Sequence, residues 1–321
     1  MCRHLGYVGS ETAVGELLTR GPHSLRTQAW APREMRGGGT INADGFGVAW
    51  WRVVEATSSA AADTAAVEAA ANDRAGAQDL TAGRGDTSGR GGVPDSGAGA
   101  GLVVSRYRNS DPIWTDPAVE EVLPQLKSGA VLASIRSATV GMPVERAACA
   151  PFVGGRWAFS HNGVVPQWRR VVTAVSADLD TAATQWGATR LFQTAHLLEA
   201  ESATDSAALW VLLGDLLDSA GPGGFVASPG AALALLATTV LQHVADARLN
   251  FLLGDGEQLW ATTVHHALSA LVTEEFAILS SEPYDDDPRW QPIPDRCVIT
   301  ARPGHLSVEP LARAGAPAGA P

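Results

Sequence analysis

The chain has 321 residues, of which 45% are hydrophobic and 18% charged, as is typical of a globular enzyme with a buried core. Its formal net charge of −11 argues against nucleic acid and anionic membranes as partners, because both bind basic surfaces. No basic segment followed by an apolar stretch opens the sequence. The apolar run at 231–240 is too short to span a bilayer, so we expect a cytoplasmic protein.

The sequence contains three cysteines, Cys2, Cys149 and Cys297, a sparse and odd set that does not suit a disulfide framework. No cysteine or histidine pair has the spacing of a zinc site. No glycine-rich loop of the dinucleotide-binding or ATP-binding type is present either. The acidic run 285–287 is more typical of a solvated turn than of a cation site. We therefore expect no metal ion and no organic cofactor.

Two segments differ from the rest of the chain in composition. Residues from about 56 to 101 are mostly Ala, Gly, Asp, Thr, Ser and Arg, and the tail 312–321 is rich in Ala, Gly and Pro. Such segments bury too little apolar surface to offset the entropy lost on ordering. We interpret the first as a mobile low-complexity insertion and the second as a disordered tail, so that residues 2–311 form a single domain.

Strands are predicted at both ends of the chain, with helices between them. Apolar and β-branched segments predict strands at 3–8, 45–54, 102–107, 130–136 and 156–160. Apolar residues at helical spacing predict helices at 184–201, 205–217 and 231–246, the second with Thr204 as N-cap. Strands return at 249–253, 258–263, 268–272, 276–280 and 296–300. This order predicts an α+β fold with two sheets and helices packed on them.

Cysteine is the second residue, so removal of Met1 would leave Cys2 with a free α-amine beside its thiol. An α-amine has an ordinary pKa of about 7.7–8.0, so part of it is neutral at pH 7 and can accept the thiol proton. Nucleophile and general base would then lie on one residue. Taken alone, Cys2 is weak evidence, because chance also places a cysteine at an ordinary position early in an edge strand.

Thiolate attack on an amide creates an oxyanion that needs hydrogen-bond donors. Asn162 and Gly163 follow a predicted strand and can supply a side-chain amide and a backbone N–H, although Asn-Gly is also a common turn. A glutamyl substrate carries a carboxylate that Arg136 can hold with two hydrogen bonds, and an ammonium group that suits Asp205. An arginine that ends a buried strand is more often an ion-pair partner than a ligand, and Asp205 also suits a helix N-terminus. Each of these residues is ambiguous alone, and their order along the chain is what matters.

Five segments in this order resemble the class II glutamine amidotransferase domains: residues 1–7 (MCRHLGY), 42–48 (NADGFGV), 134–139 (SIRSAT), 160–163 (SHNG) and 204–206 (TDS). The resemblance implies the four-layer αββα N-terminal-nucleophile (Ntn) hydrolase fold, with two stacked, mainly antiparallel sheets. It also implies that Cys2 is the nucleophile and that Asn162 and Gly163 form the oxyanion hole. Contacts to the glutamyl part are implied for Arg136, Thr139, His161 and Asp205.

Within this family the chain is most similar to the ergothioneine-pathway hydrolases. The similarity lies in residues 2–7, 28–32 (QAWAP), 42–47 and 281–283 (SEP), the last close to the acidic run 285–288. These enzymes remove glutamate from γ-glutamyl-hercynylcysteine S-oxide through a glutamyl thioester and leave hercynylcysteine S-oxide. Segment 148–151 (ACAP) lacks the histidine that precedes proline in many glutamine-dependent members, which argues against glutamine as the substrate.

Two alternatives remain open. A free-standing glutaminase subunit would pass ammonia to a separate synthetase. A binding or regulatory module would keep the fold without activity, although the complete set of Cys2, Arg136, Asn162, Gly163 and Asp205 counts against it. In each enzymatic reading the partner is a small γ-glutamyl molecule, and the sequence leaves the oligomeric state open.

Overall fold

A computed structural model describes residues 2–36, 41–54, 101–187, 192 and 194–311. By its internal contacts the chain divides into one unit of Met1–Arg52 and Val104–Pro321 and a second of Val53–Val103. The following description concerns the first unit. The predicted insertion at about 56–101 lies outside the described residues except for Gly101, which begins a strand, and the predicted tail 312–321 lies outside them entirely.

The first sheet has seven strands in the order β11-β9-β10-β1-β4-β2-β3. Its centre is the antiparallel set β10-β1-β4, in which Leu5 lies opposite both Ser280 and Ala133. The strands are β1 (Arg3–Ala13), β2 (Phe46–Val54), β3 (Gly101–Asn109), β4 (Lys127–Ile135), β9 (Ser269–Val272), β10 (Phe276–Ser280) and β11 (Gln291–Pro292).

The second sheet has six strands in the order β13-β12-β8-β7-β6-β5. Its pairs are antiparallel, and Asn162 of β6 lies opposite Asn250 of β7. The strands are β5 (Phe152–Gly154), β6 (Trp157–Val164), β7 (Arg248–Gly254), β8 (Leu259–Thr263), β12 (Cys297–Arg302) and β13 (His305–Pro310).

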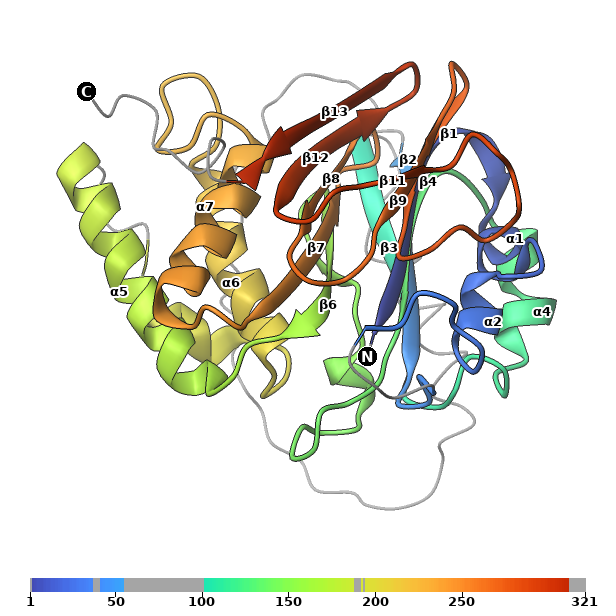
Figure 1. Cartoon of the computed structure of the whole chain (residues 1–321), viewed down its shortest axis with the longest axis horizontal. Helices are drawn as coiled ribbons and strands as arrows, with labels where there is room; N and C mark the ends of the chain where they lie inside the picture. Colours follow the sequence, from blue (N-terminus) through green and yellow to red (C-terminus); the bar gives the residue numbers. More distant parts are fainter. Residues whose placement is uncertain (1, 37–40, 55–100, 188–191, 193, 312–321) are drawn as a thin grey trace. The chain divides into compact units, whose positions relative to one another are not determined.

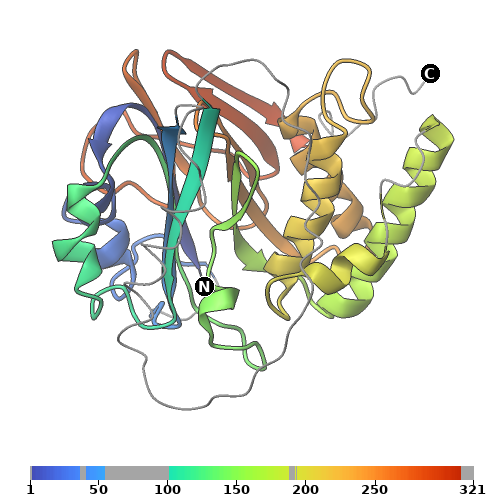
Figure 2. The same cartoon turned by 180° about the vertical axis from the view of Figure 1, so that it is seen from behind.

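Helices cover the outer face of each sheet, which gives four layers in the order αββα (Figures 1 and 2). Short helices α1 (Val14–Thr19) and α2 (Leu25–Gln28) pack on the seven-stranded sheet, and α4 (Ala118–Glu121) packs beside α1. Helices α6 (Asp205–Asp218) and α7 (Pro229–His243) pack on the six-stranded sheet, and α5 (Trp168–Trp186) packs against these two helices. The α+β class and the αββα layers predicted from the sequence are confirmed.

The alternation of side chains along β1 decides what faces the other sheet. Leu5 and Tyr7 are buried in the core beneath α1 and α2. Gly6 points the opposite way, and a Cβ at this position would lie 3.0 Å from the Leu259 side chain of β8. His4 and Gly6 of β1 therefore face the space between the sheets, and the same alternation directs Cys2, the residue before β1, to that side.

One helix prediction is wrong and another is confirmed. The expected helix 184–201 is absent, because α5 ends at Trp186, where Gly187 adopts a left-handed conformation with φ of 97°. Part of the expected span falls on residues outside the description, and a 3-10 helix follows at Thr194–Glu199. Helix α6 begins as predicted, since the Thr204 hydroxyl accepts the N–H of Ala207 at 3.2 Å. Among the described helices, none is long and apolar enough to cross a membrane.

Candidate active site

Cys2 lies directly before β1, at one end of the space between the sheets. Its thiol is partly exposed and lies 3.9 Å from the carbonyl oxygen of Ser137. His4 shares its face of the strand and is fully buried, with Nδ1 3.3 Å from the Ser160 hydroxyl of β6. Burial lowers the pKa of His4 to about 3, so this ring is neutral at pH 7. The first residues of β1 therefore reach the polar side chains of β6.

Arg136 follows β4, the neighbour of β1. Ile135 lies opposite Arg3, so one further step of the antiparallel register places Arg136 opposite Cys2 on the same face. The Arg136 side chain is only 7% exposed, and its Nη1 lies 3.5 Å from the carbonyl oxygen of Asp44. Within the described part of the chain, no carboxylate lies within ion-pair distance of it. Arg136 thus offers guanidinium donors beside Cys2.

The loop before β2 fixes the backbone around Arg136. The Asp44 carboxylate accepts the N–H of Ala138 at 2.7 Å, and the Arg136 N–H donates to the Gly45 carbonyl at 2.8 Å. Gly45 has φ of 108°, and a Cβ there would collide with the Cys149 sulfur. Burial raises the pKa of the Cys149 thiol to about 11, so Cys149 is a protonated structural thiol.

Asn162 and Gly163 lie near the end of β6, and Asn162 faces the seven-stranded sheet. The Asn162 amide is buried and lies 3.5 Å from the Ser281 hydroxyl. Ser281 in turn exchanges two hydrogen bonds of 3.0 Å with the backbone of His4, two residues from Cys2. A Cβ at Gly163 would collide with the Arg248 carbonyl oxygen, so this position requires glycine. The predicted oxyanion residues and the start of β1 are therefore linked through Ser281.

His161 points toward the helices, away from the space between the sheets. Its Nε2 lies 2.9 Å from the Arg248 carbonyl oxygen, which only accepts, so Nε2 carries the proton. Its Nδ1 then accepts from the Ser206 hydroxyl at 3.0 Å, and burial lowers the pKa of the ring. Both ring nitrogens bond protein groups in this structure, and the contact of His161 with substrate stays a prediction. The geometry gives His161 a role in joining β6, β7 and α6.

Asp205 is the first residue of α6 and is buried. Its carboxylate accepts the N–H of Val165 and the N–H of Ser206, each at 2.9 Å. These bonds attach the start of α6 to the end of β6, close to Gly163. A carboxylate has about four acceptor positions, so capacity remains for a further donor. Thr139, the other residue predicted to bind substrate, is exposed in the loop after β4.

Glu282 is a buried residue that the sequence analysis names only as part of the segment 281–283 and assigns no role. Its oxygens accept the N–H of Arg33 at 3.0 and 3.1 Å and the N–H of Glu34 at 2.9 Å. It also pairs with Arg3 at 3.6 Å, and both side chains are 1% exposed. The position of Ser281 and Glu282, two polar residues directly after an apolar strand, indicates that they could be functional. The sequence does not reveal their partners, which come from distant segments.

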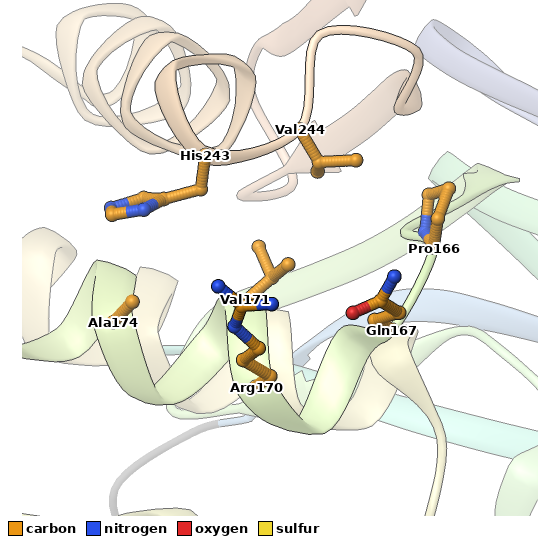
Figure 3. A pocket seen from close by; sticks show the side chains of 7 residues that line it. All are labelled: Pro166, Gln167, Arg170, Val171, Ala174, His243 and Val244. Carbon is orange, nitrogen blue, oxygen red and sulfur yellow. The ribbon is translucent and has the colours of Figure 1, made fainter.

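Surface hollows occur elsewhere on the unit. The one shown in Figure 3 lies between the start of α5 and the end of α7, with Arg170 and His243 at its wall, and does not include Cys2. Another, of about 280 Å³, is lined by Arg33, Glu34, Glu282 and, among others, Asp285 and Trp290. It adjoins β1 through the Glu282–Arg3 pair. Among the described residues, no three His, Cys, Asp or Glu side chains are grouped to hold a metal ion.

Comparison with solved structures identifies the fold. A glutamine aminotransferase class-II domain protein from Silicibacter pomeroyi aligns over 97% of this chain and 99% of its own, with a TM-score of 0.51 and 19% identity. The glutamine phosphoribosylpyrophosphate amidotransferase from B. subtilis aligns over 97% of this chain and 49% of its own, with a TM-score of 0.50 and 12% identity. The fold is therefore that of the class II glutamine amidotransferases, an N-terminal-nucleophile fold.

Sequence relatives narrow this class to one family. The γ-glutamyl-hercynylcysteine sulfoxide hydrolase of Mycolicibacterium smegmatis is 33% identical over 311 residues, covering 97% of this chain and all of the relative. The enzyme of that name from Mycobacterium tuberculosis is 32% identical over 320 residues, covering 99% of this chain and all of the relative. The chain belongs to the γ-glutamyl-hercynylcysteine sulfoxide hydrolase family. No family model matches it.

Proposed function

We propose that the protein hydrolyses the γ-glutamyl amide bond of γ-glutamyl-hercynylcysteine S-oxide, releasing glutamate and hercynylcysteine S-oxide. Family membership supports the substrate. The observation that supports the chemistry is the meeting of Cys2, the buried Arg136 and the Ser281-linked Asn162 at one end of the space between the sheets. The three cysteines are free thiols, which suits a reaction in the reducing cytoplasm.

Cys2 starts the reaction once Met1 has been removed. The neutral α-amine of Cys2 accepts the thiol proton, and the thiolate attacks the γ-carbonyl carbon. The tetrahedral intermediate collapses to a glutamyl thioester, and the ammonium of Cys2 returns a proton to the leaving amine. Water then attacks the thioester through a second tetrahedral intermediate, and glutamate leaves. The reaction consumes one water, and each proton removed by the amine is returned to a leaving group.

The surrounding residues would stabilise the oxyanion and hold the glutamyl part of the substrate. The Asn162 side-chain amide and the Gly163 N–H would donate to the oxyanion of both intermediates. Arg136 would hold the glutamyl α-carboxylate, since a buried guanidinium with free donors is suited to two parallel hydrogen bonds. Asp205, with acceptor capacity left after binding Val165, would receive the α-ammonium, and Thr139 would close the exposed side.

The test begins with the mature protein. Intact mass spectrometry should show that Met1 is absent, and mixing with the sulfoxide conjugate should release glutamate and build up a thioester on Cys2. Cys2→Ala should abolish release, whereas Cys149→Ala, which removes a buried thiol, serves as the matched control. Measuring glutamate release from glutamine as well distinguishes the proposed hydrolase from a glutaminase subunit. Release from glutamine at a rate equal to or above that from the conjugate would contradict the proposed substrate.

A further inference from the structure

The Ser281 hydroxyl stands between the start of β1 and the Asn162 amide. Ser281 directly follows β10 and is completely buried. Its Oγ accepts the N–H of His4 at 3.0 Å, while its own N–H donates to the His4 carbonyl at 3.0 Å. One terminal atom of the Asn162 amide lies 3.5 Å from the same Oγ. This hydroxyl is therefore fixed by the strand beside Cys2 and touches the residue expected to stabilise the oxyanion.

When the Asn162 amide nitrogen faces Ser281, the number of donors at this contact exceeds the number of acceptors. A hydroxyl has one hydrogen to donate and two acceptor positions. In that orientation Ser281 Oγ accepts from both His4 and Asn162 Nδ2, and its own hydrogen reaches no acceptor among the described residues. Asn162 Oδ1, fully buried, accepts from no donor in the described part of the chain. Two buried groups are thus left unpaired by one choice of amide orientation.

The opposite orientation of the amide pairs the Ser281 hydroxyl hydrogen with Asn162 Oδ1. The oxygen and nitrogen of an asparagine amide have nearly the same shape, so the hydrogen-bond network decides between them. Turned by half a rotation, Asn162 presents Oδ1 to the Ser281 hydroxyl, which donates to it while still accepting from His4. The NH₂ group then occupies the place with no protein partner. An oxyanion needs a donor at that place, and a carbonyl oxygen there would repel it.

We propose that Ser281 is a positioning residue that turns the Asn162 NH₂ group toward the reacting carbonyl. This inference rests on the proposed function for its catalytic consequence and on the hydrogen-bond network for the orientation itself. The contact of 3.5 Å is longer than the 2.5–3.0 Å of an O–H···O bond. It is expected to shorten when substrate binds, as catalytic contacts do in complexes.

A kinetic cycle tests whether Ser281 acts through Asn162. Ser281→Ala should lower kcat by roughly tenfold with little change in KM, less than the roughly 10²–10³ expected when an oxyanion donor is removed altogether. Asn162→Ala and the double variant should then be equally slow, because the serine has nothing left to orient. Ser280→Ala is the matched control. It removes a neighbouring buried hydroxyl with no partner among the described residues and should leave kcat unchanged. Losses that multiply in the double variant, or an unchanged kcat in Ser281→Ala, would overturn the proposal.

Neutron diffraction gives a readout that does not depend on activity. Crystals of the unliganded, deuterated protein should show the two deuterium atoms of the Asn162 amide on the side away from Ser281, and the Ser281 deuterium directed at Oδ1. Deuterium on the amide atom facing Ser281 would refute the assigned orientation. If the wild-type protein fails to hydrolyse γ-glutamyl conjugates while the neutron map shows the expected orientation, then the proposed function fails and the positioning of Asn162 stands.

Discussion

Replacing Arg136 with methionine separates binding of substrate from stability of the fold. Arg136 is 7% exposed, and among the described residues its side chain hydrogen-bonds only the Asp44 carbonyl, with no carboxylate in ion-pair range. Methionine keeps most of the volume and removes the charge. Because the folded protein gains no ion pair from Arg136, its loss should weaken the binding of an α-carboxylate without weakening the fold.

The expected magnitudes follow from the burial. Hydrogen bonds to a charged group contribute about 1.5–3 kcal/mol each, so two bonds to the substrate carboxylate amount to at least about 3 kcal/mol. That corresponds to a fall of roughly 150-fold in kcat/KM. A buried charge without a charged partner destabilises the fold. Replacing buried ion pairs with hydrophobic residues is neutral or stabilises proteins by about 1–4 kcal/mol. We therefore expect the free energy of unfolding of Arg136→Met to stay level or rise.

Steady-state kinetics and denaturant unfolding measure the two effects on the same sample. Arg108→Met is the matched control, because Arg108 bonds Glu201 at 2.8 Å and two carbonyl groups at 3.2 Å. It should lose stability and keep most of its kcat/KM. Added guanidinium should restore part of the activity of an Arg136→Ala variant. An unchanged kcat/KM in Arg136→Met, or a loss of stability as large as in Arg108→Met, would refute the reasoning.

Two further outcomes follow from packing and from burial. Gly163→Ala should destabilise the protein by about 2–4 kcal/mol, from overpacking against the Arg248 carbonyl and loss of the His161 hydrogen bond to it. Denaturant unfolding checks this against Gly214→Ala, whose Cβ would enter open space in α6 and should be neutral or stabilising. Burial lowers the pKa of His4 from 6.5 to about 3, so between these values the unfolded chain binds a proton that the folded protein does not. This residue's share of the stability is complete above pH 6.5 and falls by about 1.4 kcal/mol per pH unit down to about pH 3. Unfolding midpoints between pH 7 and pH 4 should therefore decline less steeply in His4→Gln, and an equal slope would contradict the assignment.

The sequence could place the site residues on elements but could not pair the elements. Alternating apolar residues predicted strands at 3–8 and 130–136, and both exist as parts of β1 and β4. A period of two tells which side chains share a face, and gives no information on which strand is the neighbour. The opposition of Cys2 and Arg136 results from that pairing across more than a hundred residues. Only the motif resemblance indicated it.

One error in the prediction has a local cause. The helix expected at 184–201 crosses Gly187, whose left-handed conformation ends α5, so the sequence itself contains the stop signal. The orientation of His161 is set by the strand in which it lies. Neighbouring residues of a strand face opposite sides, which places His161 against α6 and Asn162 between the sheets.

Some of the buried polar atoms without a partner in the described part of the chain lie where the chemistry is expected. Native interiors leave few buried polar atoms without a partner, since each lowers stability. Among the described residues, one terminal atom of the Asn162 amide and His4 Nε2 are two such atoms, and both come from strand faces that meet beside Cys2. Arg136 adds a buried charge at the same end. The apolar cores beneath each helical layer supply the stability that permits this. A site with unfilled hydrogen-bonding capacity is completed by a ligand that brings the missing groups, and a γ-glutamyl carbonyl with its α-carboxylate brings an acceptor for Asn162 and one for Arg136.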